Sequence, residues 1–226
     1  MSFPRRVEAV VFDMDGLLLD TEIVYRAAMI EAGVVFGVHF TGETYAAMVG
    51  KTTPECGVML RDLYGEAFPV QAYFERVWAD VEDLLAAETK LKAGVIEILD
   101  YLDDLGLPRG IATSNGMVAV EKYLGRFDLL QRFNAVVAHQ DVTKHKPNPD
   151  PYLLAAQRLG VDPAHCLALE DSHPGVRAAH AAGMMTIMVP DILDPNEEMH
   201  DKCVHIADSL HHVLDLLRAS VEEVAA

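Results

Sequence analysis

The sequence is poor in cysteine, and the few cysteines it has are widely spaced. Cys56, Cys166 and Cys203 are an odd number and form no CxxC motif, which argues against a disulfide framework and against a structural zinc site. No apolar run is long enough to span a bilayer, and the first residues lack the pattern of a secretory signal. We therefore expect a reduced, cytoplasmic protein with no membrane partner.

Positive charge is also scarce. The 226 residues include 18 lysines and arginines against 35 aspartates and glutamates, which gives a net charge of −17. Such a charge repels nucleic acid and anionic membranes, so we expect neither as a partner. Because it also repels a phosphorylated substrate, a site for one would need local positive charge from a metal ion or from lysine side chains.

Apolar residues make up 51% of the chain, as in globular proteins, and they gather in short runs. These runs do not alternate polar and apolar residues, which is typical of parallel strands covered on both faces. Helical periodicity lies between most of them, so the sequence predicts a doubly wound α/β sheet. The five expected strands are Ala9–Phe12, Gly110–Ala112, Ala135–Ala138, Cys166–Leu169 and Thr186–Val189.

One segment interrupts this alternation. Residues 20–87 show helical periodicity and no convincing strand. We therefore predict a small all-helical domain at 20–87, inserted into an α/β core domain formed by residues 1–19 and 88–226. Trp78, the chain's one tryptophan, is expected in the apolar core of the helical domain.

Acidic and hydroxyl side chains follow the ends of the predicted strands. Asp13 and Asp15 follow the first strand, and two carboxylates at this spacing point to the same side, where they favour a bound cation. Ligands of open α/β sheets bind beyond the carboxyl ends of the strands. Later strands and loops add further hard-cation and phosphate ligands, namely Thr113, Ser114, Asn115, Lys144, Lys146, Glu170 and Asp171.

In order and spacing these residues resemble the four motifs of the haloacid dehalogenase-like superfamily. Residues 11–22 resemble the first motif, Thr113 the second, Lys146 the third, and residues 170–172 the fourth. The helical segment 20–87 is placed like the cap of the branch that includes beta-phosphoglucomutase and phosphoglycolate phosphatase. The resemblance implies a Rossmann-like core with a cap, and a Mg²⁺-dependent phosphatase acting on a small phosphorylated metabolite, most commonly a sugar phosphate.

The resemblance also implies the chemistry of the main residues. Asp13 would attack phosphorus and form an aspartyl-phosphate, and Asp15 would serve as the general acid and then as the general base. Mg²⁺ would be held by Asp13, Asp171 and the main-chain carbonyl of Asp15, with Glu170 as a further ligand or as a partner of the ligands.

Other positions would bind the substrate. The resemblance implies that Thr113 and Lys146 bind the phosphoryl group, as would the N–H groups of Met14, Ser114 and Asn115. In the helical domain, the loop at 50–53 is expected to face the substrate, and its Lys51 is the candidate for a contact with a substrate oxygen.

Three other activities are consistent with parts of the sequence. A mutase is the alternative, although Tyr25 and Thr53 stand where beta-phosphoglucomutase carries a histidine and an arginine. An α/β-hydrolase esterase could use Ser114, because residues 112–116 imitate a nucleophile elbow. A phospho-acceptor module would not need Asp15. The identity of the substrate and the oligomeric state are not indicated by the sequence.

Overall fold

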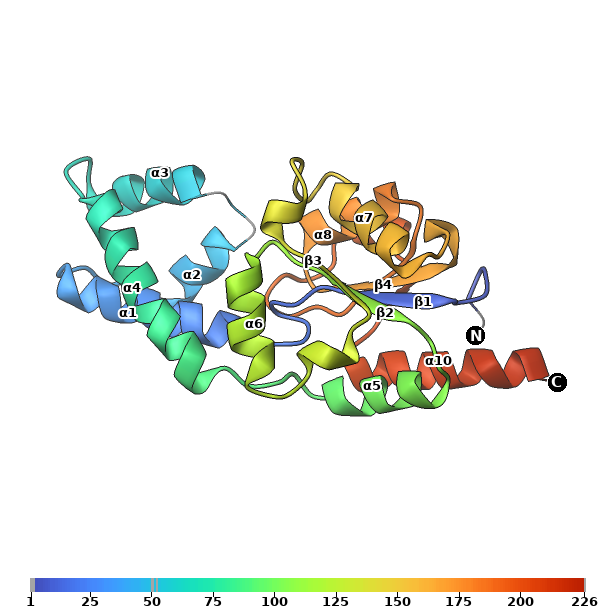
Figure 1. The fold of residues 1–226 in the computed structure, drawn as a ribbon. Helices are drawn as coiled ribbons and strands as arrows, with labels where there is room; N and C mark the ends of the chain where they lie inside the picture. The colour runs from blue at the N-terminus through green and yellow to red at the C-terminus, as the bar shows by residue number, and fades with distance from the viewer. Residues whose placement is uncertain (1–2, 50, 52, 226) are drawn as a thin grey trace. The chain divides into compact units, whose positions relative to one another are not determined.

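The computed structural model describes residues 3–49, 51 and 53–225. The chain divides into two compact units, which we call the core unit (Met1–Leu19 and Leu91–Ala226) and the cap unit (Asp20–Lys90) (Figure 1). The second boundary lies between residues 90 and 91, three residues after the predicted boundary between 87 and 88. Helix α4 (Val70–Glu88) continues to Glu88, and the N–H of Thr89 at its end donates to the Leu85 carbonyl. Over the described residues, no helix is both long enough and apolar enough to cross a bilayer.

The core unit is built on a six-stranded parallel sheet, which confirms the predicted α/β fold class. The strand order is β3-β2-β1-β4-β5-β6, so successive strands are added on one side of β1 and then on the other. Such a change of direction is where open α/β sheets bind their ligands. The strands are β1 (Ala9–Phe12), β2 (Arg109–Ala112), β3 (Ala135–Val137), β4 (Cys166–Glu170), β5 (Met185–Met188) and β6 (His205–Ile206).

The register of the central strands brings their carboxyl ends to one level. Phe12 at the end of β1 is paired with Ile111 of β2 and with Leu169 of β4. All residues of these three strands are buried, as the continuous apolar runs predicted. The polar residues that follow the three strands therefore meet at the same edge of the sheet.

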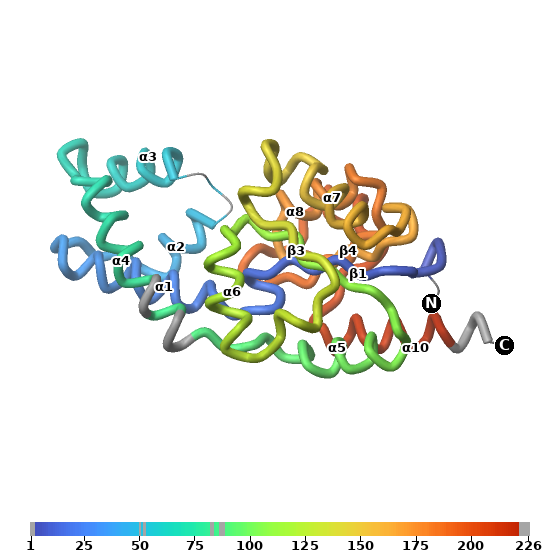
Figure 2. Tube along the Cα trace, in the orientation of Figure 1, coloured from blue at the N-terminus to red at the C-terminus, as the bar shows by residue number. Residues whose placement is uncertain are grey.

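Helices cover both faces of this sheet. Figure 2 shows α5 and α10 side by side on one face and α7 and α8 on the other. Small residues of α7 and α8 form a buried cluster with the strands, and alanines at these positions permit a close approach of helix and sheet. The helices of the core unit are α5 (Val95–Asp104), α6 (Met117–Gly125), α7 (Asp150–Leu159), α8 (His173–Ala181), α9 (Glu197–Lys202) and α10 (Leu210–Ala225). Three single 3₁₀ turns lie at η1 (Leu130–Arg132), η2 (His139–Asp141) and η3 (Pro163–His165).

The cap unit consists of four helices in its described residues, α1 (Glu22–Val35), α2 (Gly42–Met48), α3 (Thr53–Tyr64) and α4. Helices α1 and α4 pack against each other, and Tyr73 of α4 is fully buried and donates its hydroxyl to the Met29 carbonyl at 2.7 Å. The expectation that Trp78 lies in the core is wrong, because its side chain is 52% exposed. The neighbouring Val77 and Val81 take the buried face of α4, and Trp78 stacks on Phe74 instead.

Candidate active site

A buried ion-pair cluster lies where β1 and β4 end. Lys146 donates to Asp13 Oδ1 at 2.5 Å and to Glu170 Oε1 at 2.5 Å. The exposed fractions of the three side chains are only 7% for Lys146, 10% for Asp13 and 0% for Glu170. Buried charges of this kind persist only when they are paired. The lysine that reaches Asp13 is therefore Lys146, as the sequence indicated, and Lys144 is exposed.

Glu170 is held by four donors within the core unit. Besides Lys146, its Oε1 accepts from the Tyr152 hydroxyl at 2.7 Å, and its Oε2 accepts from the N–H and the hydroxyl of Ser172 at 3.2 and 2.9 Å. A Cβ added at Gly175 would lie 1.7 Å from Glu170 Oε1, so only glycine fits there. The carboxylate is thus fixed, and it fixes Lys146 in turn. Sequence reasoning missed Tyr152, which stands in an apolar helical stretch that gives no signal of a polar contact.

Three carboxylates converge beside Lys146. Asp13, Glu170 and Asp171 each offer an oxygen, and these oxygens lie within 4.8 Å of one another. The pKa of Asp13 is raised to about 7, mainly by burial and also by the charges of Glu170 and Asp15, against the opposing effect of Lys146. Burial and the nearby Asp13 likewise raise the pKa of Asp171 well above its usual range. A bound cation would relieve this repulsion, and a set of hard oxygen donors suits Mg²⁺.

A fourth carboxylate, Asp191, borders the same group. Its Oδ1 accepts from Lys92 at 2.7 Å, while its buried Oδ2 has no hydrogen-bond partner among the described residues. Gly16 has a φ of +76°, and a Cβ there would lie 2.3 Å from Asp171 Oδ2 and 3.3 Å from Asp191 Oδ2. The absence of a side chain at Gly16 therefore leaves space beside the carboxylate oxygens of Asp171 and Asp191. This arrangement fits a cation and its water. Sequence reasoning missed Asp191, although it closely follows β5 and ligands of open α/β sheets bind beyond the carboxyl ends of the strands.

Asp15 is oriented by the loop after β2. The side-chain amide of Asn115 donates to Asp15 Oδ2 at 2.6 Å. The N–H of Asn115, predicted as a phosphate donor, donates to Thr113 Oγ1 at 3.1 Å. Asn115 thus orders both the carboxylate and the hydroxyl of the candidate site, and this side-chain role was not anticipated.

The remaining predicted residues differ in their surroundings. Thr113 is buried and its N–H donates to the Val137 carbonyl, Ser114 is exposed, and Met14 is fully buried. Lys51 belongs to the cap unit, where its Nζ donates to the Ala47 carbonyl at 2.7 Å. The core unit therefore gathers Asp13, Asp15, Thr113, Asn115, Lys146, Glu170 and Asp171 at one edge of its sheet.

Known hydrolases are similar to this chain in sequence. A sequence profile described as haloacid dehalogenase-like hydrolase matches residues 10–189. Hexitol phosphatase B of Escherichia coli strain K12 is 35% identical over 198 residues, which are 84% of this chain and 86% of that protein. Fructose-1-phosphate phosphatase YqaB of the same strain is 33% identical over 196 residues, which are 82% of this chain and 97% of that protein.

A solved structure is similar to this chain as well. CbbY from Rhodobacter sphaeroides, in complex with phosphate, superposes with a TM-score of 0.73 at 29% identity, covering 90% of this chain and 95% of that one. The similarity extends over nearly the whole chain in both kinds of comparison.

Proposed function

Because the chain belongs to the haloacid dehalogenase-like hydrolase family and its relatives are named phosphatases, we propose that it is a Mg²⁺-dependent phosphatase whose nucleophile is Asp13. The observation that carries this proposal is the buried contact of Lys146 with Asp13 beside Glu170 and Asp171. An esterase using the exposed Ser114 would give these buried charges no role, so that alternative is set aside.

Asp13 has the surroundings that a carboxylate nucleophile needs. Burial favours its protonated form and Lys146 favours the ionised form, and with the nearby carboxylates these effects leave the pKa of Asp13 raised to about 7. In the first half-reaction an Asp13 oxygen forms a bond to phosphorus while the bond from phosphorus to the substrate oxygen breaks. Lys146 neutralises part of the charge on the transferred group, and we assign the Thr113 hydroxyl to donate a hydrogen bond to that group.

We assign the proton transfers to Asp15. Its carboxyl, oriented by Asn115, gives a proton to the departing oxygen, so that the product leaves as an alcohol. In the second half-reaction the Asp15 carboxylate takes a proton from water as the water oxygen bonds to phosphorus. The bond from phosphorus to Asp13 then breaks, which releases inorganic phosphate and restores both carboxyl groups.

The cation would be held by Asp13, Asp171 and the main-chain carbonyl of Asp15. Mg²⁺ bound there would neutralise phosphoryl oxygens and keep Asp13 ionised. Glu170 lies at this site, but its oxygens already accept from Lys146, Tyr152 and Ser172. We therefore assign Glu170 to the positioning of Lys146, and Asp191 to the support of the cation's water.

The names of the relatives support a phosphorylated sugar or polyol as the substrate class. One is named for hexitol phosphates and another for fructose 1-phosphate. A mutase would also have to grip a second phosphate. Tyr25 and Thr53 stand where the mutase has a histidine and an arginine, so we favour hydrolysis over phosphoryl migration on the sugar.

The experiment that tests this function is phosphate release from a panel of phosphomonoesters that includes hexitol phosphates, fructose 1-phosphate and a hexose bisphosphate. We expect release with Mg²⁺, none after chelation by EDTA, and none from Asp13→Asn. Ser114→Ala is the matched control and should retain turnover. Wild-type turnover by Asp13→Asn would refute the nucleophile, and isomerisation of the bisphosphate without net release would favour the mutase.

A further inference from the structure

The outer side of helix α1 carries a row of exposed apolar residues, which we call the α1 stripe. Ile23, Ile30 and Val34 are 54%, 37% and 74% exposed. Ala27, which lies between the first two, is exposed as well. At about 100° per residue, these four positions fall within about 60° of the helix circumference. Single apolar residues on a surface are ordinary, whereas an aligned row of them indicates a binding face.

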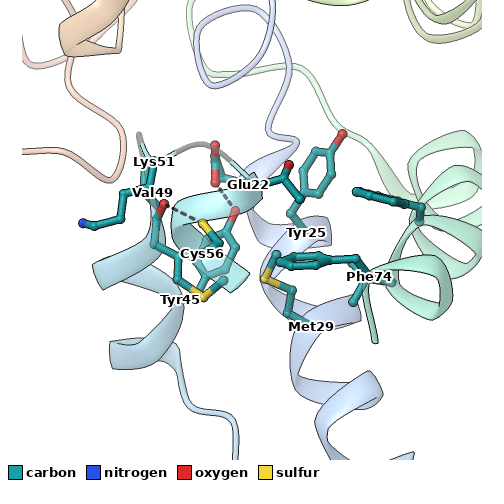
Figure 3. Close-up of a pocket in the computed structure, with 12 residues that line it drawn as sticks. Glu22, Tyr25, Met29, Tyr45, Val49, Lys51, Cys56 and Phe74 are labelled. Carbon is teal, nitrogen blue, oxygen red and sulfur yellow. Dashed lines mark hydrogen bonds between the residues drawn. The ribbon is translucent and has the colours of Figure 1, made fainter. Parts of the chain in front are cut away.

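The opposite side of α1 is already packed within the cap unit. Val24, Ala28 and Ala32 are buried there. Tyr25 and Met29 line a pocket to which all four cap helices contribute (Figure 3). The core of the cap unit therefore takes one side of α1 and does not include the α1 stripe, so burial of the stripe requires another surface.

The spacing of the α1 stripe is that of a coiled-coil seam. From Ile23 to Val34 its members are four, three and four residues apart. This is the alternation of heptad positions d and a, which keeps apolar side chains on the line where two helices meet. The stripe extends about 17 Å along the helix axis, so it offers nearly two heptads to a second helix.

Two opposite charges flank the α1 stripe. Arg26 lies on one side of it and Glu31 on the other. Both residues are exposed, and neither forms an ion pair with any residue that the structure describes. In heptad terms Arg26 is at position g and Glu31 is at the position e that follows five residues later.

This arrangement of charges is complementary to a second copy of itself. In a parallel pair of identical helices, position g of each helix faces the following position e of the other. Arg26 of each copy would therefore meet Glu31 of the other, and the pair gains two ion pairs, one on each side of the seam. In an antiparallel pair position g faces g and position e faces e, so each charge would lie on the side of its like.

We propose that α1 is the contact between two copies of this chain, which pair along the α1 stripe as a parallel two-helix coiled coil. The charges favour a second copy over an unrelated partner, because one helix sequence supplies both members of each ion pair. A seam of less than two heptads buries little surface, so the dimer should be weak and reversible. The contact uses the cap unit alone and does not depend on the proposed phosphatase activity.

Sedimentation velocity of the full chain tests the association. We expect the mean sedimentation coefficient to rise from the monomer value towards the dimer value over about a hundredfold range of protein concentration. Val34→Glu should remain monomeric over the same range, because two carboxylates would replace an apolar contact of the seam. A monomeric wild type would overturn the inference and assign the α1 stripe to a different partner.

Val35→Glu is the matched control. Val35 is the neighbouring residue, is 60% exposed, and makes the same change of side chain and charge possible on the same helix. It lies about 100° away from Val34 around the helix, outside the seam. We expect Val35→Glu to associate like the wild type. Equal loss of association in both variants, or association of Val34→Glu as strong as that of the wild type, would contradict the proposed seam.

The flanking charges test the direction of the pairing. Arg26→Glu would place two glutamates together on each side of a parallel dimer, and we expect the dissociation constant to rise about tenfold. Glu31→Arg should act in the same way with two arginines. The double variant with both changes exchanges the charges and should recover the wild-type constant to within about twofold. Failure of the double variant to recover it would refute the parallel arrangement.

Discussion

Gly175, in the first turn of α8, is the position where added volume disturbs the site most directly. A Cβ at this residue would lie 1.7 Å from Glu170 Oε1 and 1.9 Å from Glu170 Cδ. No real structure tolerates such distances, so Gly175→Ala must displace the Glu170 carboxylate or helix α8. Displacement breaks the hydrogen bonds that Glu170 accepts from Lys146 and Tyr152.

The magnitude follows from these contacts. A hydrogen bond to a charged group contributes about 1.5–3 kcal/mol, and overpacking of a core costs about 1–3 kcal/mol. We therefore expect Gly175→Ala to lower the free energy of unfolding by at least about 3 kcal/mol. Because Lys146 also loses its fixed position beside Asp13, kcat/KM should fall about 100-fold.

Urea unfolding and phosphate release measure the two effects. Gly125→Ala is the matched control, since Gly125 is the last residue of α6 and a Cβ there meets no atom within 4 Å. That variant should keep wild-type activity and gain up to about 1 kcal/mol of stability. If Gly175→Ala behaved like Gly125→Ala in both assays, the fixed position of Glu170 would be refuted.

Three further outcomes follow from the same site. Tyr152→Phe removes one donor to Glu170 and should lower the urea-unfolding free energy by about 1.5–3 kcal/mol, and an unchanged value would contradict the contact. Because the pKa of Asp13 is raised in the folded state to about 7, the metal-free protein should lose up to about 4 kcal/mol of stability as the pH rises from about 4 to 7. Excess Mg²⁺ should restore this stability, and the same pH slope in Asp13→Asn would contradict the assignment. Asp191→Asn should weaken Mg²⁺ binding about tenfold by calorimetry, with unaltered affinity as the contrary result.

The fold was predictable because apolar runs report burial on both faces. The five expected strands correspond to β1–β5, whereas β6, with two half-buried residues, is too short to leave a pattern.

The candidate-site residues that directly follow strands could be predicted from the sequence. Asp13, Glu170 and Asp171 come directly after buried apolar runs. A parallel sheet brings the carboxyl ends of its strands to the same edge. Tyr152 was not readable, because its hydroxyl contact depends on how α7 lies against the sheet.

In the proposed mechanism Asp13 carries the phosphoryl group during turnover. The direct measurement is peptide mapping by mass spectrometry of wild-type enzyme and Asp15→Asn, mixed with Mg²⁺ and a hydrolysed phosphomonoester and quenched in acid. We expect a phosphoryl adduct on the peptide that contains Asp13, and we expect it to accumulate in Asp15→Asn because water is no longer deprotonated. A phosphoryl adduct on another residue, with Asp13 unmodified, would contradict it.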